Sequence, residues 1–128
     1  MTVDAQQELF TAFKLALEAK GYAVYDGALP PENTAYPFIY LGEFRQTDTE
    51  LKNAVTGIVY PMIHVWHSDW TQRGTVSQML FTIKRVLRNM HTANFAWLVR
   101  NVNTQIVEDN TTKTPLMHGV VQADCVYS

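Results

Sequence analysis

Apolar side chains recur every three or four residues in two segments of the chain, residues 4–20 and 71–90. That spacing places them on one face of an α-helix, so we predict two helices that each bury one face. Asp4 is expected to cap the first helix, and Gly21 to end it in the left-handed conformation. The predicted buried side chains are Leu9, Phe10, Phe13, Ala16 and Leu17 in the first helix, and Val76, Met79, Leu80, Ile83, Val86, Leu87 and Met90 in the second.

Four further segments are rich in β-branched and aromatic residues and alternate with period two, which favours β-strands. They are residues 36–44, 56–68, 95–107 and 117–127, and residues 22–25 predict a short additional strand. The last of the four has one apolar face, formed by Met117, Val121, Ala123, Cys125 and Tyr127.

Polar segments rich in turn-forming residues separate these elements, at residues 26–36, 46–55 and 108–116. We predict loops there, the second of them connecting a hairpin, and loops on a rigid scaffold commonly carry binding residues. Such connections favour antiparallel pairing. The predicted class is α+β: an antiparallel or mixed sheet with two helices packed on one face, in the order helix, strands, helix, two strands.

The segment from Ile58 to Trp66 is apolar on both of its alternating faces. Two helices cover only one face of a sheet, so unless loops cover the other we expect a second subunit to meet it. Tyr60, Met62 and Trp66 are therefore candidate interface residues. Pro61 has no amide hydrogen to donate, which predicts a sheet edge or a β-bulge at this point.

Composition limits the class of protein. The 128 residues are 47% hydrophobic and 17% charged, which excludes an intrinsically disordered chain and predicts one domain over residues 1–128. The formal net charge of −2 argues against a generally basic nucleic-acid-binding protein. No apolar run approaches the ~20 residues that span a bilayer, so no membrane association is expected.

No residue pattern predicts a catalytic, cofactor or metal site. His64 and His67 lie three apart on a predicted strand, so they face opposite sides, and His118 has no acid or thiol spaced to join it. Cys125 alternates with core positions, which favours a small buried side chain over a nucleophile. The six glycines are scattered and form no phosphate-binding loop. We therefore expect neither enzymatic activity nor a bound cofactor.

Charge is unevenly divided along the chain. Residues 1–50 hold three basic and eight acidic side chains, whereas residues 51–108 hold six basic and two acidic ones. Surfaces of opposite sign on one protomer suit head-to-tail contact around a ring. The charged side chains that we expect to orient a partner from the predicted loops are Glu50, Lys52, Asp109 and Lys113.

Three segments carry a resemblance to a known family. They are Tyr36-Pro37-Phe38-Ile39-Tyr40-Leu41-Gly42-Glu43, Ile63-His64-Val65-Trp66-His67-Ser68 and Met117-His118-Gly119-Val120-Val121. With the order of elements, they make the chain resemble the tail-completion, or tail-terminator, proteins of long-tailed bacteriophages. The resemblance covers essentially the whole chain.

The resemblance implies a hexameric ring that caps the tail tube, stops its polymerisation and joins the tail to the head. The implied partners are further copies of the chain, the tail tube protein and the head-side connector protein, with DNA passing through the lumen without sequence-specific binding. It implies no active site, no cofactor and a place in the virion tail or neck after synthesis in the host cytoplasm. The alternatives are a head-completion adaptor or stopper, and a small ligand-binding or enzymatic α+β domain.

Overall fold

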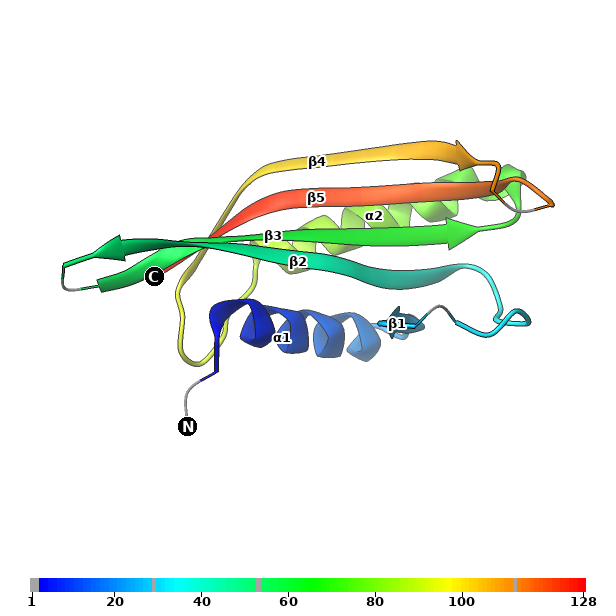
Figure 1. Cartoon of the computed structure of the whole chain (residues 1–128). Coiled ribbons are helices and arrows are strands. Elements are labelled where there is room, and N and C mark those ends of the chain that lie inside the picture. Colours follow the sequence, from blue (N-terminus) through cyan, green and yellow to red (C-terminus); the bar gives the residue numbers. More distant parts are fainter. Residues whose placement is uncertain (1–2, 29, 53, 112) are drawn as a thin grey trace.

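The computed structural model describes residues 3–28, 30–52, 54–111 and 113–128, and Figure 1 shows the arrangement of its elements. The class is α+β and the predicted order of helices and strands is confirmed. In chain order the elements are α1 (Ala5–Ala19), β1 (Val24–Asp26), β2 (Phe38–Leu51), β3 (Ala54–His67), a 3₁₀ helix (Trp70–Gln72), α2 (Arg73–Arg88), β4 (Trp97–Asp109) and β5 (Leu116–Tyr127).

The five strands form one sheet in the order β1-β2-β3-β5-β4. Three of the pairings are antiparallel, but β1 runs parallel to β2, with Val24 opposite Ile39. Of the two predicted alternatives, the mixed sheet is confirmed and the wholly antiparallel sheet is wrong, because of β1. The connection between β1 and β2 is long enough to permit a parallel neighbour.

Both helices pack against the same face of the sheet, as predicted (Figure 1). Asp4 caps α1 by accepting a hydrogen bond from the amide of Ala5, and Gly21 follows the helix with a φ of +91°. The helices and the sheet together enclose the core. Its fully buried side chains include Leu9, Phe13 and Leu17 of α1, Ile83 and Leu87 of α2, Val59, Ile63 and Val65 of β3, and Met117, Val121 and Cys125 of β5.

Pro61 lies in the middle of the sheet, because β3 is bonded to β2 on one side and to β5 on the other. The alternative of a sheet edge is therefore wrong. The alternative of a bulge is confirmed in the neighbouring strand, where the register shifts between Leu41 and Phe44, the latter being the partner of Pro61. A second irregularity lies in β4 between Arg100 and Asn103. Bulges increase the local twist of a sheet.

Residues 46–51 and 54–55 are paired strand residues, so the prediction of a loop over 46–55 is wrong, whereas the predicted hairpin is confirmed. The strands β2 and β3 continue their ladder to the pair Leu51 and Ala54. We call the paired residues 48–51 and 54–57 the ribbon; Figure 1 shows it projecting from one end of the sheet. Polar strand residues outside a core are difficult to distinguish from a loop by hydropathy, although the β-branched Thr47, Thr49 and Val55 favour a strand.

Polar contacts fix the base of the ribbon to the body of the protein. The side chain of Gln46 accepts a hydrogen bond from the amide of Gln6 at 2.9 Å and donates one to Asp4 at 3.0 Å. The hydroxyl of Tyr127 donates to the carboxylate of Asp48. That bond lowers the pKa of Asp48, and burial followed by this bond raises the pKa of Tyr127 to about 12. The ribbon therefore leaves the body in a defined direction.

Candidate assembly surface

The face of the sheet opposite the helices carries no helix (Figure 1), and we call it the open face. Alternate side chains of β3 are buried toward the helices, whereas the side chains between them are only partly buried and lie on the open face. Tyr60, Met62 and Trp66, the predicted interface residues, are all on this face, together with Ile58 and His64. The structure therefore brings these three predicted residues onto one surface.

An aromatic and histidine cluster occupies one part of the open face. The rings of Trp66 and His118 stack with centroids 3.8 Å apart and planes within 6°. His64 Nδ1 lies 2.7 Å from His118 Nε2, so one ring donates a hydrogen bond to the other. His64 also lies against Tyr40, with ring centroids 6.1 Å apart. The sequence analysis considered only an acid or a thiol as a partner for His118, and the partner in the structure is a second histidine, His64.

Burial keeps this cluster uncharged. Desolvation lowers the pKa of His64, and it lowers the pKa of His118 to about 4, with the nearby His64 lowering it further and Asp109 raising it. Both imidazoles are thus neutral at pH 7. The cluster presents a flat, uncharged aromatic surface rather than a cationic one.

Residues 30–37, which lead into β2, lie against one end of the open face. Tyr36 stacks on Phe38 with ring centroids 5.4 Å apart, and the hydroxyl of Tyr40 donates to the carbonyl oxygen of Gly27. A depression of about 300 Å³ remains between this loop and the sheet, lined by Pro30, Pro31, Glu32, Thr34, Tyr36, Phe38, Tyr40, Trp66, Asp109, Thr111 and Leu116. Part of the apolar second face is therefore covered by the chain itself.

The centre of the open face is polar. The guanidinium of Arg45 lies over the ring of Tyr60, 4.3 Å from its centroid, and Asn101 donates to the carboxylate of Asp124 at 2.8 Å. These side chains surround a hollow of about 220 Å³ beside Met62. A partner that covers the open face would meet an aromatic end and a polar centre of mixed charge.

The four predicted charged residues lie at opposite ends of the sheet. Glu50 is in β2 and Lys52 follows it at the end of the ribbon, whereas Asp109 ends β4 and Lys113 lies in the connection to β5. The carboxylate of Asp109 accepts bonds from the amide and hydroxyl of Thr111 at 2.8 and 2.6 Å, which lower its pKa. The four residues therefore form two separate charged ends of the sheet and not one cluster.

The described residues form no metal cluster and contain no activated thiol. No three His, Cys, Asp or Glu side chains converge on a possible metal position among the residues that the structure describes. Cys125 is buried, and burial raises the pKa of its thiol to about 12, so it is not an activated nucleophile. Across the described ranges, no helix has the length and apolar character needed to cross a bilayer.

The sequence could not reveal the His64–His118 pair, because it depends on the register between β3 and β5. That register sets His64 opposite Val120 and Trp66 opposite His118, which places the two histidines diagonally. The available signal was that both histidines alternate with core positions on predicted strands. Arg45 over Tyr60 depends in the same way on the pairing of these two residues between β2 and β3.

Comparison with known proteins identifies a shared fold. No family model and no curated protein matches this sequence. A chain from the solved structure "Virion of native gene transfer agent (GTA) particle" superimposes with a TM-score of 0.63 at 16% identity, covering 97% of this chain and 95% of that one. A second solved protein, whose name describes no activity, matches with a TM-score of 0.56 at 16% identity, covering 97% and 96%. Over 97% of its length the chain thus shares its fold with a chain in each of these two solved structures.

Proposed function

We propose that the protein is a structural component of a phage-type virion that caps the tail tube as a hexameric ring and joins the tail to the head. The observation that carries the proposal is the fold match, over 97% of the chain, to a component of a gene transfer agent virion. The resemblance of three segments to tail-completion proteins supports the tail end as its place. The open face, with its partly exposed aromatic cluster, supplies a surface for subunit or partner contact.

The proposed mechanism is mechanical. A ring on the last layer of the tube occupies the surface to which the next tube subunit would bind, so polymerisation stops. The outer surface of the same ring then offers the head-side connector protein a docking site, and DNA passes through the lumen. The partners are other copies of the chain, the tube protein and the connector. The protein is made in the host cytoplasm and located in the virion.

We favour this role over a ligand-binding or enzymatic domain. The cavities found among the described residues are open depressions, and no cluster of three metal-ligating side chains lines any of them. A head-completion adaptor or stopper is the closest alternative, because it would also be a small ring protein at the same junction.

Loss of the gene distinguishes these roles by electron microscopy of the particles that remain. A terminator predicts free filled heads together with unattached tails whose tubes are abnormally long. An adaptor or stopper predicts tails of normal length and heads that fail to retain DNA. Intact particles in normal yield would contradict every assembly role. Restoration of joined particles by the wild-type gene on a plasmid is the control.

A further inference from the structure

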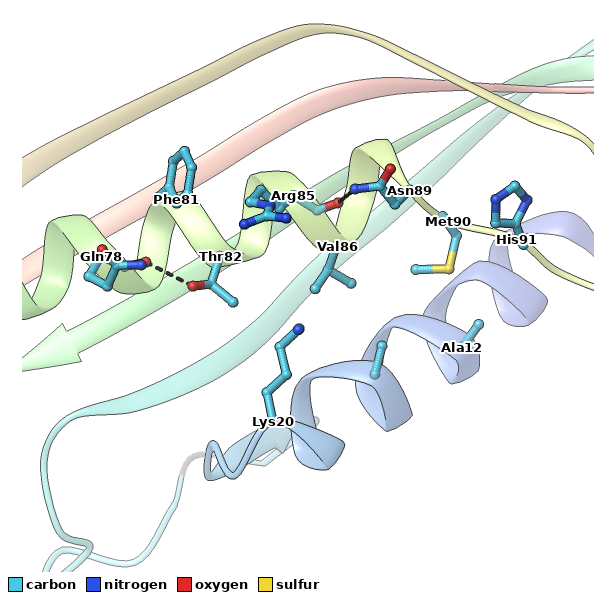
Figure 2. Close-up of a pocket in the computed structure, with 11 residues that line it drawn as sticks. Ala12, Lys20, Gln78, Phe81, Thr82, Arg85, Val86, Asn89, Met90 and His91 are labelled. Carbon is cyan, nitrogen blue, oxygen red and sulfur yellow. Dashed lines mark hydrogen bonds between the residues drawn. The ribbon is translucent and has the colours of Figure 1, made fainter.

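A groove runs between the two helices on the side of the protein away from the sheet (Figure 2). Its volume is about 480 Å³. Ala12 and Ala16 of α1 are small, and they leave space opposite Val86 of α2 and Met90 just after it; Figure 2 shows Val86 pointing toward α1. We call this the interhelical groove, and its base is apolar.

The charge at the rim of the interhelical groove is positive. Lys20 extends from the end of α1 toward α2, and Arg85 lies above it on α2 (Figure 2). Among the described residues that line the groove, none is acidic. Over the described ranges the single ion pair joins Lys14 to Asp26 at 3.4 Å, so neither rim cation is paired within its own chain. Phe81, 48% exposed, lies beside Arg85.

The apolar base and the positive rim determine which kind of peptide segment could bind in the interhelical groove. The apolar base favours aliphatic side chains, and unpaired cations at the rim favour a carboxylate placed beside them. A matching segment is therefore narrow, apolar and acidic.

One face of the ribbon, which carries Val55 and Glu50, has this chemistry. Val55 is 72% exposed, and Glu50 lies directly opposite it in the ladder, so both side chains are on the same face of the ribbon. It is the face of Gln46, which contacts the start of α1. Figure 1 shows the ribbon projecting beyond the body, and its base is fixed by the bonds of Gln46 and Asp48. The tip is thus presented to another molecule in a preset orientation.

We propose that the ribbon tip of one copy docks in the interhelical groove of the next copy, with Val55 on the apolar base and Glu50 beside Lys20 and Arg85. The proposal rests on the self-association in the proposed function and names its contact. The two surfaces differ, so the contact is head-to-tail, and repetition around an axis closes a ring. The contact places Glu50, from the acidic residues 1–50 of one chain, beside Arg85, from the basic residues 51–108 of the next.

Site-directed cross-linking on assembled tails tests the contact. Two variant chains, Val55→Cys and Gln78→Cys, are expressed together in particle-producing cells, and isolated tails are treated with a short bis-maleimide. Val55 is exposed, Gln78 is exposed and lines the groove, and the native Cys125 is buried. We expect the cross-linked dimer to form at least tenfold faster than in a control pair of Val55→Cys with Gln105→Cys, an exposed position on β4.

Charge reversal provides the second arm. Glu50→Arg added to the first chain should slow cross-linking severalfold, and Arg85→Glu in the second chain should restore it. Arg88→Glu, exposed on the same helix but outside the groove, is the matched control and should restore nothing. Cross-linking no faster than in the Gln105 pair would assign the groove to another occupant and overturn the proposal, while a ring at the tail end would still stand. Absence of the chain from tails would overturn the proposed function itself.

Discussion

His64 Nδ1 and His118 Nε2 lie 2.7 Å apart on the open face, in a pair formed by neighbouring strands β3 and β5. One imidazole donates and the other accepts, which requires that at least one ring be neutral. Trp66 stacks on His118, and both histidines are partly buried. Protonation of this pair in acid therefore changes the open face, which is the surface that we assign to assembly.

The histidine pair predicts a loss of stability in mild acid. In the unfolded chain each imidazole titrates near pH 6.5, whereas burial lowers the pKa of His118 to about 4 in the fold. The unfolded state thus binds the proton more readily, and this stability is lost as the pH falls from about 6.5 to about 4. Calorimetry should show a smaller decrease in Tm over this range for His118→Gln than for the wild type. Equal decreases would contradict the pairing.

The buried face of α2 predicts a large difference between two neighbouring positions. Leu80 is buried in the core, whereas Gln78 is exposed, so Leu80→Ala should cost about 2–5 kcal/mol and Gln78→Ala less than about 0.5 kcal/mol. Denaturant unfolding measures both. The reverse ranking would mean that the face of the helix has been assigned wrongly.

Two glycines should respond to alanine in opposite directions. A Cβ at Gly57 would lie 2.3 Å from the carbonyl oxygen of Thr47 and 2.5 Å from the hydroxyl of Tyr127, so Gly57→Ala should destabilise the fold by about 1–3 kcal/mol. At Gly74, in α2, a Cβ meets nothing within 4 Å. Gly74→Ala should stabilise the helix by about 0.5–1 kcal/mol. Thermal unfolding of both variants tests the close packing at the base of the ribbon.

Charge at the ribbon tip should affect joining but not folding. Exchange of the two charges, Glu50→Lys with Lys52→Glu, keeps the net charge and changes exposed side chains, so the free energy of unfolding should shift by no more than about 0.5 kcal/mol. Attachment of tails to heads in an in vitro complementation assay should decrease. Glu18→Lys, exposed on α1, is the control and should leave joining unchanged. Unchanged joining in the ribbon variant would mean that joining depends on the open face and not on the charges of the ribbon tip.

The parts of the fold that depend on local periodicity were predictable. Helix α1 covers Ala5–Ala19 within the predicted residues 4–20, and the alternation in β5 gives the correct buried face. The apolar segment around Tyr60 also indicated a second exposed face. These features follow from which side chains a single element must bury.

The remaining features depend on how elements meet. The parallel pairing of β1 is set by the route of the chain over the sheet. The ribbon consists of paired strand residues that cover no hydrophobic core, so its hydropathy does not mark it as a strand. The His64–His118 pair requires the register of β5 on β3. The interhelical groove depends on Ala12 and Ala16 facing Val86 across two helices. None of these relationships is contained in one segment of sequence.

The most direct test of the central claim is cryo-electron microscopy of purified tails at the end that meets the head. The account predicts a ring of six copies of this chain on the last layer of the tube, with the helices and sheet of Figure 1 fitted to the density. Labelling of an exposed cysteine variant such as Gln105→Cys identifies the chain in the ring. A tail end without this chain, or its presence only in heads that lack tails, would contradict the account.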